Sequence, residues 1–203
     1  SKTSGIYVNS CSPTINNSTI ANNTSYGLHV NGGSPAITNN TFTNNKSYGC
    51  VLNNAVFTTY SGNTFSGNNI NGFVINGNVT SNCTLSSDAP VVLNSSFTIN
   101  DNVTLAVEAG TVVKGTSSGY LYVYGRLDVN GTTANPVVFT SIKDDSYGGD
   151  TNGDGNATVP APGDWYGIYL YGSSTYDGIG EFDGSIFRYG GYSSWYNVWF
   201  DQS

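Results

Sequence analysis

The sequence predicts an all-β protein that folds as a parallel β-solenoid with about 22 residues per coil. Three observations lead to this prediction. Short apolar motifs recur at a nearly constant spacing through the first half of the chain. Asn, Ser and Thr make up 74 of the 203 residues and Gly another 26, while strong helix formers are scarce, which favours strands and turns. Hydrophobic residues still form 37% of the chain, too many for a disordered protein.

The first repeated motif is a glycine followed by alternating apolar residues and an asparagine. Its glycines are Gly5, Gly27 and Gly49, which are equally spaced, and Gly72, which follows after a slightly longer interval. Successive side chains of a strand point to opposite faces, so one alternating set must face the interior. We assign to the interior Ile6, Val8, Leu28, Val30, Cys50, Leu52, Phe73 and Ile75. The set expected to face outward is Tyr7, His29, Val51 and Val74.

This period is too short for a β-α-β unit, which needs about 30 residues, but it suits one coil of a solenoid. Coils in such a stack lie about 4.8 Å apart. An asparagine ends the same strand in each repeat, and stacked side-chain amides can hydrogen-bond from coil to coil. The predicted structural ladder consists of Asn9, Asn31, Asn53 and Asn76.

This pattern of glycine, inward aliphatic residue, any residue, inward aliphatic residue and asparagine covers about residues 4–85. It resembles the repeats of the right-handed parallel β-helix proteins found outside bacterial and archaeal cells. The resemblance implies a right-handed parallel β-helix (β-solenoid) and an extracellular or cell-surface location. It does not select a function, because lyases, adhesins and inert spacers share this fold.

The composition changes near Asp88, since all 13 acidic residues lie from there onward. We therefore divide the chain into Asn-rich coils at 1–87 and continuing coils at 88–203, within one continuous solenoid. The same period persists, because Thr104-Leu-Ala-Val is followed by Arg126-Leu-Asp-Val. The stretch from Glu108-Ala-Gly-Thr-Val-Val-Lys through Asn135-Pro-Val-Val-Phe-Thr-Ser to Gly163-Asp-Trp-Tyr-Gly-Ile resembles the opening coils of secreted β-helix surface proteins. Its last predicted strand, 197–201, has no polar capping element after it, which favours pairing between chains.

An acidic insertion is expected at 142–164. Asp150, Asn152 and Asp154, followed by a glycine, match the first half of a Ca²⁺-binding loop, in which alternate oxygen ligands reach one cation. Ala161 occupies the position of the final glutamate, so the loop is not an EF-hand. The alternative is a solvated acidic turn. The expected ligands, including those contributed by folding back, are Asp144, Asp145, Asp150, Asn152, Asp154 and Asp164.

Catalysis on polysaccharides requires paired carboxylates, or Ca²⁺ together with a base. Residues 1–87 contain no acid and only two lysines, so they lack these groups. In the second half the candidate charges are Arg126, Asp128, Glu181, Asp183 and Arg188, whose spacing resembles scattered surface charge. We therefore expect no enzymatic activity, and no catalytic residue is assigned.

Aromatic residues concentrate in the second half of the chain, where stacked coils would align them into an outward strip. We consider three roles for this strip: stabilising an exposed sheet, packing against another subunit, and stacking on sugar rings. The residues assigned to it are Tyr120, Tyr122, Tyr124, Tyr169 and Tyr171.

Asn-x-Ser/Thr sequons are dense. They reflect either repeated turn motifs or sites of N-glycosylation in a secreted protein. The sequon asparagines are Asn16, Asn17, Asn22, Asn23, Asn39, Asn45, Asn78, Asn82, Asn94, Asn102, Asn130 and Asn156.

The sequence as a whole favours a non-enzymatic extracellular structural module. We expect a rod, filament or surface-layer component that Ca²⁺ stabilises and that self-associates end to end or laterally. One alternative is an adhesin or carbohydrate-binding module that uses the aromatic strip, and a second is a polysaccharide-active β-helix enzyme. A net charge of −7 argues against nucleic acid as a partner, and no apolar run is long enough to predict membrane insertion.

Overall fold

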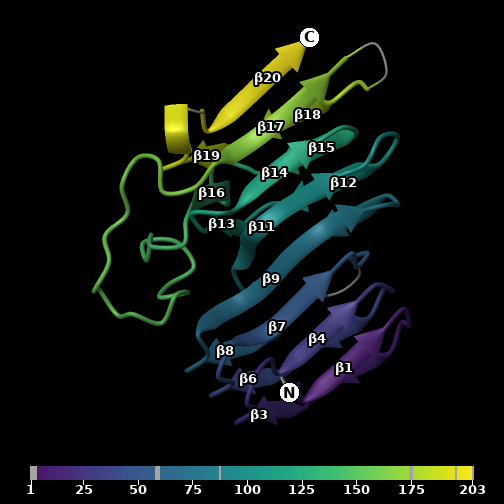
Figure 1. Ribbon diagram of the computed structural model, residues 1–203, viewed down its shortest axis with the longest axis vertical. Coiled ribbons are helices and arrows are strands. Elements are labelled where there is room, and N and C mark those ends of the chain that lie inside the picture. Colours follow the sequence, from purple (N-terminus) through teal and green to yellow (C-terminus); the bar gives the residue numbers. More distant parts are fainter. Residues whose placement is uncertain (1–3, 58–59, 87, 174–175, 195, 203) are drawn as a thin grey trace.

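The protein is a right-handed parallel β-solenoid. The computed structural model describes residues 4–57, 60–86, 88–173, 176–194 and 196–202. Strands from successive coils are stacked along the long axis, with the N-terminal strands at one end and the C-terminal strands at the other (Figure 1). Every pairing between named strands is parallel, as expected when each strand lies on the corresponding strand of the preceding coil.

The largest sheet runs the length of the solenoid and has 11 strands. Its main path consists of β1 (Ile6–Asn9), β4 (Leu28–Asn31), β7 (Tyr48–Asn53), β9 (Ile70–Val79), β11 (Val91–Ile99), β13 (Val112–Gly115), β16 (Val137–Ser141) and β19 (Ser185–Phe187). A branch of the same sheet consists of β14 (Tyr120–Val123), β17 (Gly167–Gly172) and β20 (Val198–Gln202).

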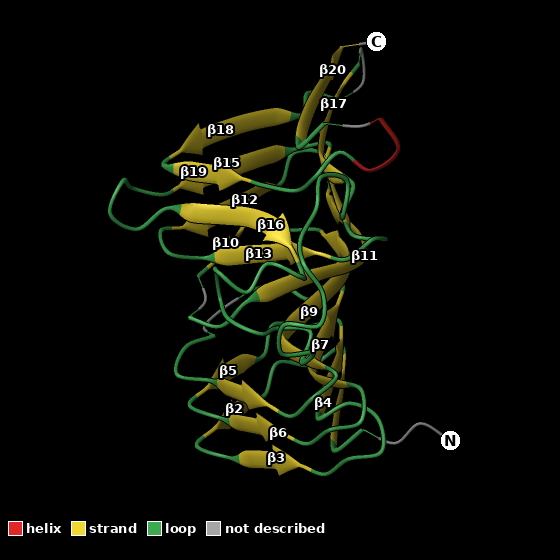
Figure 2. Cartoon of the chain, turned by 90° about the vertical axis from the view of Figure 1, so that its left-hand side faces the viewer, coloured by secondary structure: helices red, strands yellow, loops and turns green. Residues whose placement is uncertain are grey.

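Three smaller sheets form the other sides of the coils, and Figure 2 shows them stacked along the same axis. One contains β10 (Cys83–Leu85), β12 (Thr104–Glu108), β15 (Arg126–Asn130) and β18 (Ile179–Asp183). The other two contain β2 (Thr14–Asn16) with β5 (Ala36–Thr38), and β3 (Thr19–Ala21) with β6 (Thr41–Thr43) and β8 (Thr64–Ser66). The single helix among the described residues is a 3-10 turn at Tyr192–Ser194.

The strand register follows the sequence period. Leu28 pairs with Ile6 below it and Cys50 above it, and Cys50 pairs with Phe73 in the next coil. The inward set forms the core, in which Leu28, Cys50 and Phe73 are fully buried. Aromatic rings continue the stack through the interior, since the rings of Phe42 and Phe65 lie nearly parallel with centroids 4.9 Å apart.

The coil changes shape where β9 meets β11. These are the two longest strands, and β11 pairs along its first part with β13 and along its last part with β14. The large sheet therefore forks at this point, close to the change in composition at Asp88. The two segments separated there share one sheet, because Val91 of β11 pairs with Phe73 of β9.

The outward side chains also pair in register from coil to coil, but their exposure to solvent changes along the solenoid axis. Tyr7 is 58% exposed, whereas Val51 and Val74 are buried. Val92 pairs in register with Val74 in the next coil. Val51, Val74 and Val92 belong to a second apolar cluster outside the solenoid core, and this cluster packs against Ile142. The valines are buried because other segments cover this face, which the alternation within the strands does not show.

The predicted asparagine ladder is present in two pieces. Asn31 Nδ2 donates to Asn9 Oδ1 over 3.2 Å, and Asn76 Nδ2 donates to Asn53 Oδ1 over 3.1 Å. Between these two pairs the amide of Asn53 turns aside and lies 3.0 Å from His29 Nε2. The ladder of side-chain hydrogen bonds therefore runs from Asn9 to Asn76 with one interruption, between Asn31 and Asn53.

A second, buried ladder was not predicted from the sequence. Asn23 Nδ2 donates to Asn45 Oδ1, and Asn45 Nδ2 donates to Asn68 Oδ1, over 2.8 and 2.9 Å. Asn45 and Asn68 are 1% and 4% exposed. Asn40 and Asn63 form the equivalent buried pair at another corner of the coil. The buried amides also donate to backbone carbonyls at these corners, in the bonds of Asn40, Asn45, Asn63 and Asn68 to Ile15 O, Ile20 O, Ile37 O and Phe42 O, respectively.

Residues with a left-handed backbone precede these inward asparagines. Asn39 and Asn44 have φ of 55° and 54°, and they come directly before Asn40 and Asn45. One coil later, glycines with positive φ take their place before the inward amides. Asparagine and glycine tolerate this conformation better than other residues. The signal in the sequence is therefore an Asn-Asn or Gly-Asn doublet repeated at the coil period.

Candidate functional site

The acidic insertion at 142–164 leaves the solenoid between β16 and β17 and extends along its flank (Figure 1). It is held back against earlier coils by specific contacts. The backbone N–H of Asn71 donates to Thr151 O over 2.8 Å, and Lys114 Nζ donates to Gly149 O over 2.7 Å. The insertion therefore connects coils of the two halves of the chain. The burial of Lys114 lowers the pKa of its ammonium group to about 8.

Three carboxylates converge within the insertion. Oxygen atoms of Asp145, Asp150 and Asp154 all lie within 4.8 Å of one another. In the described part of the chain, the buried oxygens Asp145 Oδ1, Asn152 Oδ1 and Asp154 Oδ1 have no hydrogen-bond partner. Buried oxygens without a donor are costly, and a bound cation can satisfy oxygens of this kind.

The loop backbone fixes this arrangement. Both oxygens of Asp150 accept backbone N–H groups, from Asp154 over 3.0 Å and from Gly155 over 2.9 Å. Asn152 Nδ2 donates to Asp154 Oδ2 over 2.8 Å. Burial, followed by the charge of Asp150, raises the pKa of Asp145, as expected for carboxylates crowded without a counterion. Oxygen ligands held this way suit a hard divalent cation such as Ca²⁺.

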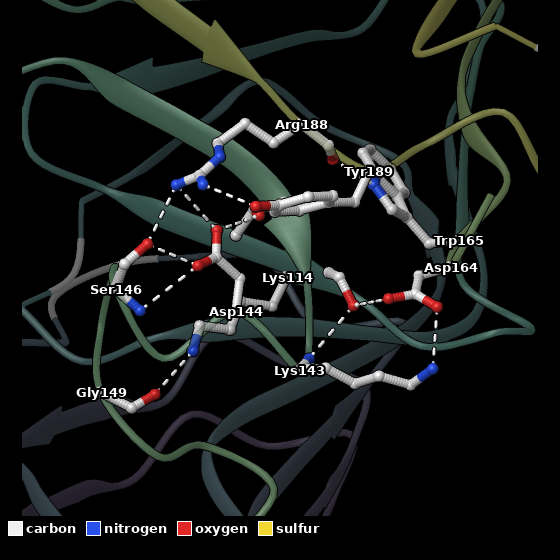
Figure 3. Close-up of polar contacts among 11 residues, drawn as sticks. Lys114, Lys143, Asp144, Ser146, Gly149, Asp164, Trp165, Arg188 and Tyr189 are labelled. Atoms are coloured by element: carbon white, nitrogen blue, oxygen red, sulfur yellow. Dashed lines mark hydrogen bonds and ion pairs between the residues drawn. The ribbon is translucent and has the colours of Figure 1, made fainter. Parts of the chain in front are cut away.

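The structure does not bring Asp144 and Asp164, two of the expected ligands, into this carboxylate cluster. Each forms an ion pair with a basic side chain instead (Figure 3). Arg188 Nη1 lies 3.1 Å from the buried Asp144 Oδ2, and Lys143 Nζ lies 2.8 Å from Asp164 Oδ1. Arg188 is distant from Asp144 in the sequence, so local spacing could not show this pair.

Hydrogen bonds complete the environment of Asp144. Thr140 Oγ1 donates to Asp144 Oδ2 over 2.6 Å, and Ser146 Oγ donates to Oδ1. Burial favours the neutral carboxyl, but these hydrogen bonds and the charge of Arg188 outweigh burial and lower the pKa of Asp144. Arg188 also donates to Tyr189 OH over 2.7 Å. This ion-pair cluster anchors the start of the insertion to the solenoid.

The predicted aromatic strip is assembled on β14 and β17. Tyr122 pairs in register with Tyr169, and Tyr169 pairs with Trp199 of β20. The rings meet edge to face, at 89° between Tyr122 and Tyr169 and at 64° between Tyr169 and Trp199. Tilted rings of this kind stabilise one another. They do not form the single flat face on which a sugar ring stacks.

Four of the five candidate charges for catalysis lie on β15 and β18, while Arg188 directly follows β19. Asp128 pairs in register with Glu181, and Asn130 with Asp183. Arg126 forms an ion pair with Glu181, and both side chains remain open to solvent. The bases of the ion-pair cluster, Lys143 and Arg188, are likewise engaged with carboxylates.

The sequon asparagines differ in accessibility. Asn45 is buried in the inner ladder, and the Asn23 amide donates to it. Three others, Asn94, Asn130 and Asn23 itself, are half-buried. The exposed sequon asparagines are Asn16, Asn17, Asn22, Asn39, Asn78, Asn82, Asn102 and Asn156.

Two family models match the chain. One is described as a right handed beta helix region and covers residues 1–134, and the other is described as a pectate-lyase like beta helix domain and covers residues 77–197. Together they span both halves of the solenoid. No curated protein and no solved structure gives a significant match. In the described residues, no helix has the length and apolar character needed to cross a membrane.

Proposed function

The chain belongs to the right-handed parallel β-helix family, and from this premise we propose that it is a non-enzymatic structural module of an extracellular or cell-surface protein, stabilised by Ca²⁺. The observation that carries the proposal is the group of three unpartnered buried oxygens in the insertion. Ca²⁺ bound there would fix the insertion, which is itself hydrogen-bonded to β9 and β13.

The ligand set that we propose is narrower than the sequence suggested. Asp145, Asp150 and Asp154 supply carboxylate oxygens, and Asn152 supplies its amide oxygen. Ca²⁺ prefers six to eight oxygens, so water would complete the shell. The cation would relieve the mutual repulsion of the three carboxylates.

Calcium titration of the full chain tests this site. We expect isothermal titration calorimetry to show one bound Ca²⁺ with a Kd of about 10⁻⁴ M, in the range of extracellular modules. The substitution Asp145→Asn should weaken binding by roughly tenfold or more, because it removes one ligand charge. Without Ca²⁺ the same variant should be as stable as the wild type or more stable, because repulsion is relieved.

The matched control is Asp183→Asn, which removes an exposed carboxylate on β18, outside the cluster. It should leave Ca²⁺ affinity unchanged. Equal affinity in the wild type, the Asp145→Asn variant and the Asp183→Asn variant would contradict the assigned site. A wild-type chain that takes up no Ca²⁺ would refute calcium stabilisation.

We also propose that the module self-associates, either laterally or end to end. Supporting this, the C-terminal coils carry exposed apolar side chains close together in the sequence, namely Tyr192, Tyr196 and Phe200. Exposed aromatic groups of this kind are common at protein interfaces. Sedimentation velocity should show association that increases with concentration and that the double substitution Tyr196→Ser, Phe200→Ser reduces. A wild-type monomer across the concentration range would contradict this proposal.

The two alternative functions predict different experimental results. A carbohydrate-binding module or adhesin would lose affinity for glycans when Tyr122 and Tyr169 are replaced. A polysaccharide-active enzyme would release reducing ends or unsaturated products from polysaccharides. The edge-to-face rings of the strip and the ion-paired bases support the structural proposal over both.

A further inference from the structure

A surface groove of about 530 Å³ lies beside the ends of β14 and β17, away from the acidic insertion. It is not part of the proposed calcium site. Among the described residues, three tyrosines and three polar residues line it: Tyr124, Tyr171, Tyr176, Thr98, Asn100 and Asp101.

The backbone holds the three tyrosines in place. Tyr124 directly follows β14, and Tyr171 lies within β17. Two hydrogen bonds join Tyr176 to Ser173, because Ser173 N donates to Tyr176 O over 2.8 Å and Tyr176 N donates to Ser173 Oγ over 3.1 Å. An antiparallel bridge between Gly172 and Asp177 closes this turn.

The three rings are mutually tilted. Tyr124 and Tyr176 have centroids 5.0 Å apart at 63°, Tyr124 and Tyr171 are 5.4 Å apart at 53°, and Tyr171 and Tyr176 are 6.3 Å apart at 64°. Two of these three contacts are edge to face, so the rings meet at angles and do not form one flat platform. A compact cation can contact several ring faces at once, whereas a flat sugar ring stacks on one.

The charge around the groove is negative. Asp101 lines it and is exposed, and Asp177 is exposed beside it. The nearby base, Arg126, is ion-paired with Glu181. A cation entering the groove would therefore meet aromatic faces and at least one carboxylate whose charge is not balanced by Arg126.

We propose that this groove binds an organic cation, specifically a quaternary ammonium group carried on a larger molecule. Aromatic walls attract such a cation through the negative potential of their faces, and its weak hydration makes its transfer from water less costly than that of a metal ion. The volume of the groove leaves room for the substituent that carries the ammonium group.

The test uses the full chain and compares choline with 3,3-dimethylbutan-1-ol, the uncharged isostere in which carbon replaces the ammonium nitrogen. We expect choline to shift the tyrosine ring resonances in NMR spectra with a Kd on the order of 1 mM. The isostere should bind roughly fivefold or more weakly, because it has the same shape without the charge.

Three variants localise the effect. Tyr176→Leu keeps an apolar side chain but removes a ring, and it should weaken choline binding by roughly fivefold. Asp101→Asn should weaken choline binding by a smaller factor, and high salt should abolish this difference between the variant and the wild type. The control is Tyr192→Leu, which changes an exposed tyrosine outside the groove and should leave binding unchanged.

Equal binding of choline and its isostere would overturn the proposal, because the groove would then select only for apolar shape. A shift caused by a neutral oligosaccharide in a chain that ignores choline would overturn it in favour of a carbohydrate site. Absence of any shift with choline would also overturn it. None of these outcomes bears on calcium binding, which is measured separately.

Discussion

The substitution Asn45→Leu is expected to lower the free energy of unfolding by about 3 kcal/mol or more. The Asn45 side chain accepts from the backbone N–H and the Nδ2 of Asn23, and it donates to Ile20 O and to Asn68 Oδ1. Leucine has a similar volume but none of these bonds, so several buried polar groups lose their partners. Each buried group left unpaired costs about 1 to 3 kcal/mol.

Thermal unfolding checks this expectation. For a chain of this size a loss of about 1 kcal/mol lowers Tm by about 2 to 4 °C, so the variant should melt at least about 6 °C below the wild type. The matched control is Asn31→Leu in the outer ladder, where the side chain is exposed and makes one ladder bond. The control should cost less than about 1 kcal/mol. Equal losses in the two variants would contradict the distinction between the buried and exposed ladders.

The second large effect is expected from Arg188→Met. This substitution leaves the Asp144 carboxylate buried without its cation. Removing one partner of a fully buried pair costs about 3 to 5 kcal/mol. Because Arg188 retains some contact with water, we expect about 2 to 3 kcal/mol from urea unfolding at neutral pH. Methionine keeps an apolar side chain over Tyr147 and Tyr189, so the loss reports on the charge and the hydrogen bonds of the guanidinium group.

The pH dependence has a defined sign. The pKa of Asp144 is lowered in the folded protein, so its stabilising contribution is present above its unfolded pKa and is lost as pH falls through the folded value. The difference between wild type and Arg188→Met should therefore be full at neutral pH and shrink as the pH falls through the folded pKa of Asp144. The control Arg126→Met breaks a solvent-exposed pair and should cost at most about 0.5 kcal/mol. A constant difference at all pH values would contradict the role assigned to Asp144.

Much of the fold follows from the sequence period because a solenoid repeats one local pattern. The spacing of Gly5, Gly27 and Gly49 sets the register, and the alternation around them identifies the buried face. The same alternation placed Val51 and Val74 outward, yet both are buried. Their cover comes from segments outside their own strands, including Ile142, and no local pattern encodes that contact.

The ligands of the candidate calcium site were likewise only partly predictable from the sequence. Asp150, Asn152 and Asp154 lie at alternate positions of one loop, so their spacing alone suggested a shared cation. Asp145 joins them by folding back, while its neighbour Asp144 turns away toward Arg188. Whether an aspartate joins the carboxylate cluster or forms an ion pair therefore depends on which basic side chain the solenoid places opposite it. The buried asparagines were missed because an Asn-Asn doublet also fits an exposed turn.

We propose that Ca²⁺ bound in the insertion stabilises the solenoid. The most direct measurement is the calorimetric melting of the wild-type chain in EDTA and in about 10 mM Ca²⁺, which is about 100 times the expected Kd. Ligand binding at that ratio contributes about 2.7 kcal/mol, so we expect Ca²⁺ to raise Tm by about 5 to 10 °C. Identical melting curves in EDTA and in Ca²⁺ would contradict it.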